Sequence, residues 1–271
     1  IMYNLKDKIV LVTGGAIGIG AISVQLFLEE GAKHVTFTDI RENAGKQLEN
    51  ELNSSYEGRV EFIKSDATND EELFAVYEKI IHDHGFIDVV VNNAGIMNDS
   101  QEVYKKELNI NITALITSSL KAWKLMRKDR AGRGGVIMNI SSIAALMQDR
   151  YMPVYYGAKS AVLQFSMCLG SHENYKKTDV KVITICFGAT DTNLLKKGNL
   201  KPFDEELTDE FFEFVQQFPY QRVESAAKGL IEVCQRGESG STWLVKNDKP
   251  AMEITPVVKK AYSLLTELVT N

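Results

Sequence analysis

Short apolar runs alternate with helix-like stretches along most of this chain of 271 residues. The runs lack strict apolar–polar alternation, which is typical of strands that are buried on both faces of a parallel sheet. Helices between such strands cross over and cover both faces of the sheet. The sequence therefore predicts a three-layer, doubly wound α/β fold with a central parallel sheet of about seven strands. The predicted strands are 9–12, 34–38, 60–63, 87–91, 135–140, 180–185 and 242–245.

No repeat or flexible linker divides the chain, so we expect a single domain over residues 1–271. Residues 190–221 follow the sixth predicted strand and hold several phenylalanines. We expect this insertion to be either a substrate lid or a helical hairpin that covers the core. Residues 246–271 form a C-terminal tail, whose weakly amphipathic part we expect to pack on a neighbouring subunit or on its own domain. The predicted helices are 18–30, 43–53, 70–83, 102–128, 155–174 and 223–236.

Composition argues against several functional classes. A net charge of −5, from 31 basic and 36 acidic residues, does not suit a protein that binds nucleic-acid phosphates. Three cysteines without a CxxC pair predict neither a disulfide framework nor a metal site, and they favour a cytoplasmic protein. Residues 9–28 carry no charge, but their glycines indicate a strand, a turn and a helix rather than a membrane span.

A glycine-rich turn, Thr13 to Gly20, follows the first predicted strand with the spacing GxxxGxG. Gly14 permits a tight turn, and Gly18 lets backbone N–H groups approach a pyrophosphate at the start of a helix. Asp39 ends the second strand, nineteen residues beyond Gly20, where a carboxylate accepts hydrogen bonds from ribose hydroxyls. This context predicts a Rossmann-type dinucleotide site.

The same carboxylate favours NAD over NADP, because Asp39 would repel a 2′-phosphate at close range. Arg41 is the one residue that argues for NADP, since its side chain could turn toward such a phosphate. Asp66 lies just beyond the third strand, where it is either a contact for the adenine amino group or an ordinary turn aspartate.

Tyr155 and Lys159 are four residues apart in a predicted helix, so they share one face. An ammonium near a phenol lowers the phenol's pKa and makes tyrosine a general base. Ser142 ends the fifth strand, at the same sheet edge as the glycine turn. These three side chains are the candidate catalytic group.

Together these motifs resemble the short-chain dehydrogenase/reductase family over about residues 7–245. Thr13 to Gly20 matches the pattern TGxxxGxG, and Asn92 to Gly95 matches NNAG. Ser142, Tyr155 and Lys159 have the family's thirteen-plus-four spacing. Asn111 falls where the family has its fourth catalytic residue.

The resemblance implies an NAD-dependent oxidoreductase that interconverts a secondary alcohol and a ketone. Ser142 would bind the substrate oxygen, and Tyr155 would take the alcohol proton as hydride leaves for the nicotinamide. Lys159 would bind the nicotinamide ribose and tune Tyr155, and Asn111 would hold a water of a proton relay. The implied cofactor-binding residues are Gly14, Gly18, Ile19, Gly20, Asp39, Asp66, Asn93, Ala94, Gly95, Tyr155, Lys159, Gly188, Thr190 and Thr192.

The chain departs from the family after the sixth strand, where Cys186-Phe187-Gly188 replaces Asn-Pro-Gly. Losing the proline removes a rigid φ, which puts cofactor affinity or the order of the following segment in question. Segments 93–96, 134–139 and 152–159 are most similar to insect-type alcohol dehydrogenases and NAD-dependent 15-hydroxyprostaglandin dehydrogenases.

Two other functions remain open, an NADPH-dependent carbonyl or steroid reductase and a non-catalytic NAD-binding protein. Met147, Tyr151, Met152 and the phenylalanines of 203–218 suggest an apolar pocket, so we expect a small apolar alcohol or ketone as substrate. We expect neither nucleic acid nor a membrane as partner. The resemblance also implies a homodimer or homotetramer.

Overall fold

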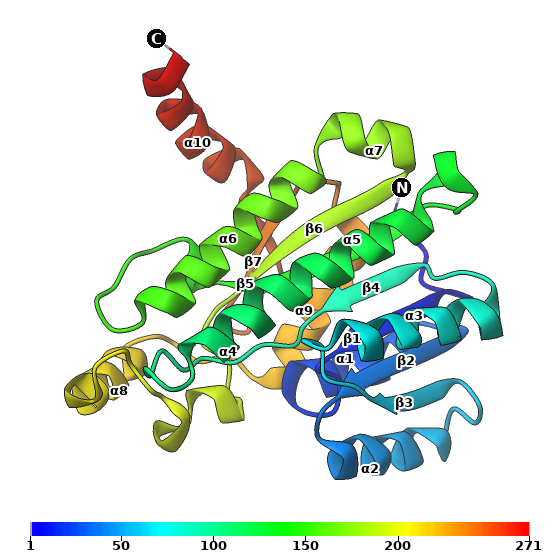
Figure 1. Cartoon of the computed structure of the whole chain (residues 1–271), viewed down its shortest axis with the longest axis horizontal. Coiled ribbons are helices and arrows are strands. Elements are labelled where there is room, and N and C mark those ends of the chain that lie inside the picture. Colours follow the sequence, from blue (N-terminus) through cyan, green and yellow to red (C-terminus); the bar gives the residue numbers. More distant parts are fainter. Residues whose placement is uncertain (1, 271) are drawn as a thin grey trace.

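The computed structural model describes residues 2–270, which fold around one eight-stranded sheet (Figure 1). The strand order is β3-β2-β1-β4-β5-β6-β7-β8. All neighbours are parallel except the pair β7 and β8. The predicted doubly wound α/β fold is therefore confirmed. The strands are β1 Ile9–Thr13, β2 His34–Asp39, β3 Val60–Lys64, β4 Val89–Asn92, β5 Gly135–Ser142, β6 Val180–Phe187, β7 Thr242–Val245 and β8 Met252–Glu253.

The eighth strand is an addition to the seven that the sequence predicts. It contains only two residues, and both are exposed. A strand this short carries no apolar pattern, so the sequence holds no signal for it.

Helices cover both faces of the sheet, as the doubly wound fold requires. Two helices differ from their predicted ranges. The predicted helix 155–174 ends at Leu169 and a second helix follows it, and the predicted helix 102–128 contains a π-helical stretch, Asn109–Ala114. The α-helices are α1 Gly18–Glu29, α2 Glu42–Asn53, α3 Asp70–His84, α4 Tyr104–Leu108, α5 Leu115–Met126, α6 Pro153–Leu169, α7 His172–Thr178, α8 Thr208–Gln216, α9 Val223–Arg236 and α10 Thr255–Thr270.

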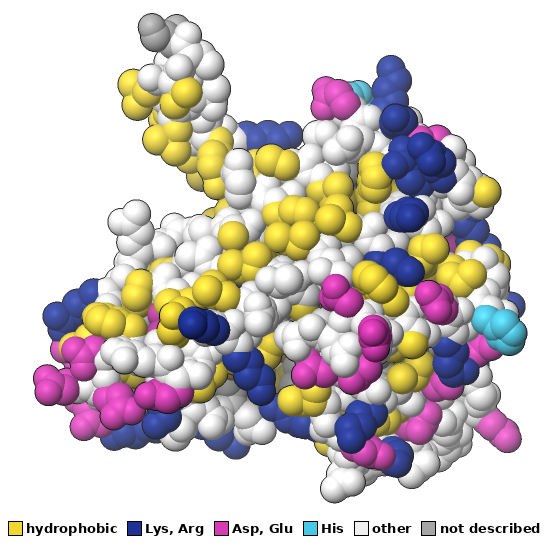
Figure 2. Space-filling model, in the orientation of Figure 1, with side chains coloured by type: hydrophobic (Ala, Val, Ile, Leu, Met, Phe, Trp, Pro, Cys, Tyr) yellow, Lys and Arg dark blue, Asp and Glu magenta, His cyan; other side chains and the backbone are white. Residues whose placement is uncertain are grey.

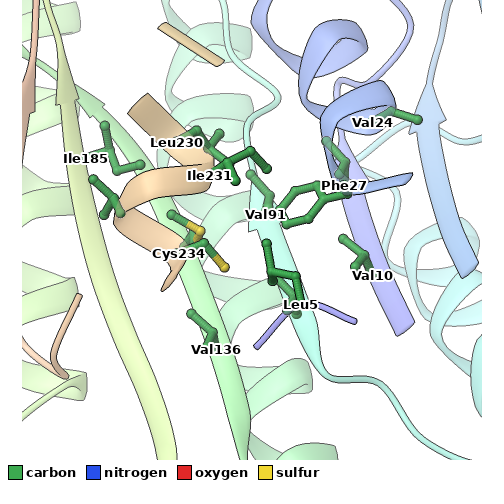
Figure 3. Packing of buried hydrophobic residues seen from close by; sticks show 14 of the residues in the cluster. Leu5, Val10, Val24, Phe27, Val91, Val136, Ile185, Leu230, Ile231 and Cys234 are labelled. Atoms are coloured by element: carbon green, nitrogen blue, oxygen red, sulfur yellow. The ribbon is translucent and has the colours of Figure 1, made fainter. Parts of the chain in front are cut away.

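One apolar core lies between the sheet and helices α1 and α9. Figure 3 shows Phe27 of α1 and Leu230 of α9 packed beside Val10 and Val91 of the central strands. Full burial of a side chain such as Phe27 contributes about 1.5–3 kcal/mol to stability. A second core joins the opposite face to α3 and α5. The two cores hold β1, β4 and β5 rigidly, and the ends of these strands carry the candidate site.

A third apolar cluster lies at the carboxyl end of the sheet, between the start of α6 and α8 of the 190–221 segment. The last helix, α10, projects away from the sheet (Figure 1). Among residues 2–270, no helix is long and apolar enough to cross a membrane. The same residues contain no group of three or more His, Cys, Asp or Glu side chains that could hold a metal ion.

Candidate active site

The glycine turn joins β1 to α1 in a conformation that depends on its glycines. Gly14 and Gly18 have φ of +64° and +60°, backbone angles that residues other than glycine rarely adopt. A Cβ on Gly20 would lie 2.2 Å from the carbonyl oxygen of Gly14. The residue before α1, Ile17, offers no capping side chain to the first N–H groups of the helix. These N–H groups are therefore free to bind a phosphate.

The segment after β4 braces this turn. The Asn93 amide donates to the carbonyl oxygens of Thr13 (3.1 Å) and Gly14 (2.8 Å), and Ala94 N donates to the Thr13 hydroxyl. A Cβ on Gly14 would lie only 2.8 Å from Ala94 Cα. Asn93, Ala94 and Gly95 line the same open cleft as Gly14, Gly18 and Ile19. These residues form the wall of the cleft in which the sequence predicts a dinucleotide.

Asp39 lies at the far side of this cleft and is 6% exposed. Its Oδ2 accepts a hydrogen bond from Ala16 N of the glycine turn, and its Oδ1 accepts one from Arg41 N. The Arg41 guanidinium turns back to the same carboxylate, with Nη1 3.4 Å from Oδ1. Arg41, which favours NADP, thus forms an ion pair with Asp39, which favours NAD.

Asp66 lines the same cleft. Its Oδ1 accepts hydrogen bonds from both the backbone N and the hydroxyl of Thr68. The turn role that the sequence left open is therefore present, and an adenine contact stays a prediction.

Ser142, Tyr155 and Lys159 meet at the carboxyl end of β5. The Ser142 hydroxyl accepts a hydrogen bond from Ala144 N and lies within hydrogen-bonding reach of the Tyr155 phenol. Lys159 Nζ donates to the carbonyl oxygen of Ile140 (3.1 Å) and lies 5.6 Å from the centre of the Tyr155 ring. Serine, tyrosine and lysine thus come together as their spacing predicts.

Burial dominates the electrostatics of Tyr155 and Lys159. Burial raises the pKa of the phenol, and the hydroxyl of Ser142 opposes this only in part. Burial also lowers the pKa of Lys159, to about 8. The Lys159 ammonium donates to the Ile140 carbonyl, and its tuning of the Tyr155 pKa stays a prediction.

Asn111 approaches this group from the π-helical stretch between α4 and α5. Its side chain exchanges two hydrogen bonds with the backbone of Ile96, at 2.8 and 3.0 Å. A Cβ on Gly95 would lie 3.2 Å from Asn111 Oδ1 and 3.7 Å from Lys159 Nζ. Asn111 and Lys159 therefore flank Gly95 closely, and the water-mediated relay between them stays a prediction.

An apolar cavity of about 170 Å³ opens beside Ser142 and Tyr155. The 190–221 segment forms much of its wall through Phe211, Phe214 and Phe218. The Tyr151 ring lies 5.2 Å from the rings of both Phe211 and Phe214, centre to centre. The segment therefore packs over the candidate catalytic group, and a role as substrate lid stays a prediction.

Thr190 and Thr192 lie at the base of this segment and line the apolar cavity, and Thr192 also lines the cleft of the glycine turn. Buried Gln221, at the segment's other end, donates to the Thr190 hydroxyl and to the Val245 carbonyl, both at 3.0 Å. The sequence gives no signal for Gln221, because a single glutamine in a loop belongs to no motif or periodic pattern.

A sequence model of a family described as short chain dehydrogenase matches residues 8–202 of this chain. The chain belongs to the short-chain dehydrogenase family. This confirms the resemblance found in the motifs.

Curated relatives of this short-chain dehydrogenase match it over most of their length. It is 30% identical to human 15-hydroxyprostaglandin dehydrogenase [NAD(+)] over 237 residues, which is 86% of this chain and 88% of the human protein. The mouse protein of the same name is 29% identical over 86% of this chain and 87% of its own. Alcohol dehydrogenase 1 of Ceratitis cosyra is 30% identical over 94% of this chain and 97% of its own.

Local contacts hold the chain where Phe187 replaces the family's proline, and an effect on cofactor affinity stays a prediction. Phe187 is buried in the core and also lines the apolar cavity. Gly188 N donates to the Val245 carbonyl, and a Cβ on Gly188 would lie 2.6 Å from Lys246 Cβ. Packing and hydrogen bonds hold the chain here without the rigid φ of a proline.

Proposed function

We propose that this short-chain dehydrogenase interconverts a secondary alcohol and a ketone with NAD as cofactor. One observation carries the proposal. Ser142, Tyr155 and Lys159 line the apolar cavity, which adjoins the glycine-turn cleft because Gly95 and Thr192 line both. A substrate oxygen at that junction would face a hydroxyl donor, a phenol and an ammonium at once.

The residues of the cleft fit NAD. Free N–H groups at the start of α1 would hold the pyrophosphate, and the Asp39 carboxylate would bind the adenosine ribose hydroxyls. Lys159, Thr190 and Thr192 lie toward the end that would hold the nicotinamide. When bound, NAD supplies the hydride acceptor for alcohol oxidation.

In this mechanism, Ser142 donates a hydrogen bond to the substrate oxygen and fixes its orientation. Tyr155 takes the alcohol proton during oxidation and returns it to the ketone during reduction. Because burial raises the pKa of Tyr155, the phenolate needs the charge of Lys159 and the hydroxyl of Ser142 to form. Asn111 would hold a water that connects Lys159 to solvent.

NAD is favoured over NADP by the charge at Asp39. A 2′-phosphate beside the ribose would meet this buried carboxylate, whose desolvation makes the repulsion strong. The Arg41 guanidinium, which could offset that repulsion, is already paired with Asp39. The 15-hydroxyprostaglandin dehydrogenases that resemble the chain carry NAD(+) in their names.

The substrate we propose is a small apolar secondary alcohol. The cavity walls beside Tyr155 are phenylalanine, leucine and valine side chains, which bind hydrocarbon rather than charged groups. The test is NADH formation by the purified protein over alcohols of increasing size, from propan-2-ol to steroids and prostaglandins. Turnover with NAD on one size class supports the proposal, and a strong preference for NADP would favour a carbonyl reductase instead. Binding of NADH without turnover of any alcohol would favour the non-catalytic alternative.

We further propose that the protein is a homo-oligomer. Figure 2 shows hydrophobic side chains over the face of α5 and α6 and on the projecting α10. Leu120 of α5 and Leu264, Leu265 and Leu268 of α10 are each 46% exposed or more. Exposed apolar surface of this kind is typical of faces that a second copy covers. Sedimentation velocity tests this, because a monomer at micromolar concentration would contradict it.

A further inference from the structure

Two carboxyl groups lie buried behind the start of α6, the helix that carries Tyr155. Asp99 is 2% exposed and Glu107 is 0% exposed. Asp99 accepts hydrogen bonds from Val154 N (2.6 Å) and Tyr155 N (3.0 Å). These N–H groups belong to the first turn of α6 and have no partner within the helix. The Asp99 carboxylate therefore anchors the backbone of the catalytic tyrosine.

Glu107 of α4 holds Asp99 from the other side. Its Oε1 accepts a hydrogen bond from Asn98 N (3.1 Å), the residue before Asp99, and its carboxyl group lies within hydrogen-bonding reach of that of Asp99. Its Oε2 is buried and finds no donor within residues 2–270. Two charged carboxylates buried at such close range repel each other and neither can donate a hydrogen bond, so a proton on one of them stabilises the pair.

The surroundings assign that proton to Glu107. Asp99 accepts two backbone N–H bonds, which favour its charged form, whereas Glu107 accepts one. Burial and the neighbouring Asp99 charge raise the pKa of Glu107 to about 8. A proton on Oε2 also gives that orphaned atom a partner.

We propose that Asp99 and Glu107 share one proton and act together as a positioning device for Tyr155. Protonated Glu107 donates to Asp99, and Asp99 holds the first turn of α6. The consequence for catalysis rests on the function proposed above, whereas the shared proton does not.

The pair also reaches the 190–221 segment. Asp99 N donates to the carbonyl oxygen of Lys201 (2.8 Å), and Asn98 forms a β-bridge with the same residue. Loss of the shared proton would place two carboxylates side by side, and their repulsion would loosen the contacts to α6 and to this segment. The charged and titratable groups that face the pair are Asp149, which acts on Asp99, Lys159, which acts on Glu107, and Tyr155.

The first test measures unfolding free energy by urea from about pH 5 to pH 9 for wild type and Glu107→Gln. The amide of glutamine keeps the acceptor for Asn98 N and donates permanently to Asp99. The pKa of Glu107 is raised on folding, so its stabilising contribution is present at low pH and is lost as pH rises to about 8. Relative to the variant, the wild-type folding constant should therefore fall by up to about tenfold per pH unit over this window.

The control is Glu102→Gln, because Glu102 is an exposed carboxylate just before α4. Its stability curve should run parallel to that of the wild type. If the Glu107→Gln curve is also parallel, no shared proton exists and the proposal is overturned. This result would leave the proposed dehydrogenase function standing, since the measurement needs no substrate.

The second test follows kcat/KM against pH. Wild type should lose activity as pH rises through about 8, and Glu107→Gln should lose less, because only the deprotonation of Lys159, whose pKa is also about 8, then remains. An unchanged alkaline limb in the variant would contradict a positioning role. If the variant does not fold, infrared spectra of the wild type still decide. They should show a protonated carboxyl band near neutral pH that disappears by about pH 9, and absence of that band at neutral pH overturns the proposal.

Discussion

At the scale of single residues, the pairing of Asp39 with Arg41 bears directly on cofactor choice. The Asp39 carboxylate accepts hydrogen bonds from Ala16 N and Arg41 N, and it forms an ion pair with the Arg41 guanidinium at 3.4 Å. Replacement of Asp39 by serine would remove the charge and release Arg41 toward the ribose. We expect Asp39→Ser to lower the KM for NADP and raise the KM for NAD, each by about tenfold or more. Initial rates with each cofactor measure this shift.

The variant Asp39→Asn separates charge from shape. It keeps an acceptor for Ala16 N but removes the repulsion of a 2′-phosphate. We expect it to improve NADP use less than serine does, because the amide still fills the site. An undiminished preference for NAD in both variants would show that Asp39 does not select the cofactor.

Much of the candidate site follows from sequence because its residues occupy the ends of predictable strands and helices. Ser142, Tyr155 and Lys159 come together because β5 and α6 run as their patterns predict. Asp99 and Glu107 were missed, since their contact depends on the fold of the loop after β4 rather than on any spacing. The orientation of the Lys159 ammonium was also beyond sequence, because it depends on one backbone carbonyl.

At the scale of elements, the boundaries that the sequence misplaced have local causes. Helix α6 ends beside Gly170, where the backbone passes so close to Gly240 that a Cβ on Gly170 would lie 2.6 Å from Gly240 N. The Ser171 hydroxyl then caps α7 by accepting a hydrogen bond from Asn174 N. The π-helical stretch has no apolar signature, and within it the Asn111 side chain forms two hydrogen bonds with the backbone of Ile96. Only tertiary contact reveals such a change of helical register.

The glycine turn provides a sharp test at this scale. A Cβ on Gly20 would meet the Gly14 carbonyl at 2.2 Å, so Gly20→Ala must displace the turn. We expect a loss of about 1–3 kcal/mol in unfolding free energy and at least about tenfold weaker NADH binding. Urea unfolding and fluorescence titration measure the two effects.

The matched control is Gly157→Ala. A Cβ on Gly157 meets nothing within 4 Å, and the residue lies exposed within α6. This variant should gain about 0.5–1 kcal/mol, because alanine favours a helix interior over glycine. Equal NADH affinity of wild type and Gly20→Ala would show that the turn does not hold the dinucleotide.

At the scale of the whole molecule, the response to acid depends on a histidine far from the site. His34 begins β2, and its ring centre lies 4.4 Å from that of His84. Burial lowers the pKa of His34 to about 4, with a further contribution from His84. Between about pH 6.5 and pH 4, His34 is therefore protonated in the unfolded chain and neutral in the folded chain. The free energy of unfolding falls as pH falls through this window.

We expect His34→Gln to flatten that acid slope, measured as unfolding free energy between about pH 7 and pH 4. His172→Gln is the control, because His172 is exposed at the start of α7. A slope that is equally steep in wild type and His34→Gln would rule out His34 as the source.

The central claim is that Tyr155 transfers the proton of a secondary alcohol while NAD is bound beside it. Its most direct test is NADH formation from that alcohol by wild type and Tyr155→Phe, with NADH binding measured on both proteins. We expect the variant to lose about 10²–10⁴-fold in kcat and to bind NADH as wild type does. A variant that keeps most of its turnover would show that the alcohol proton has an acceptor other than Tyr155.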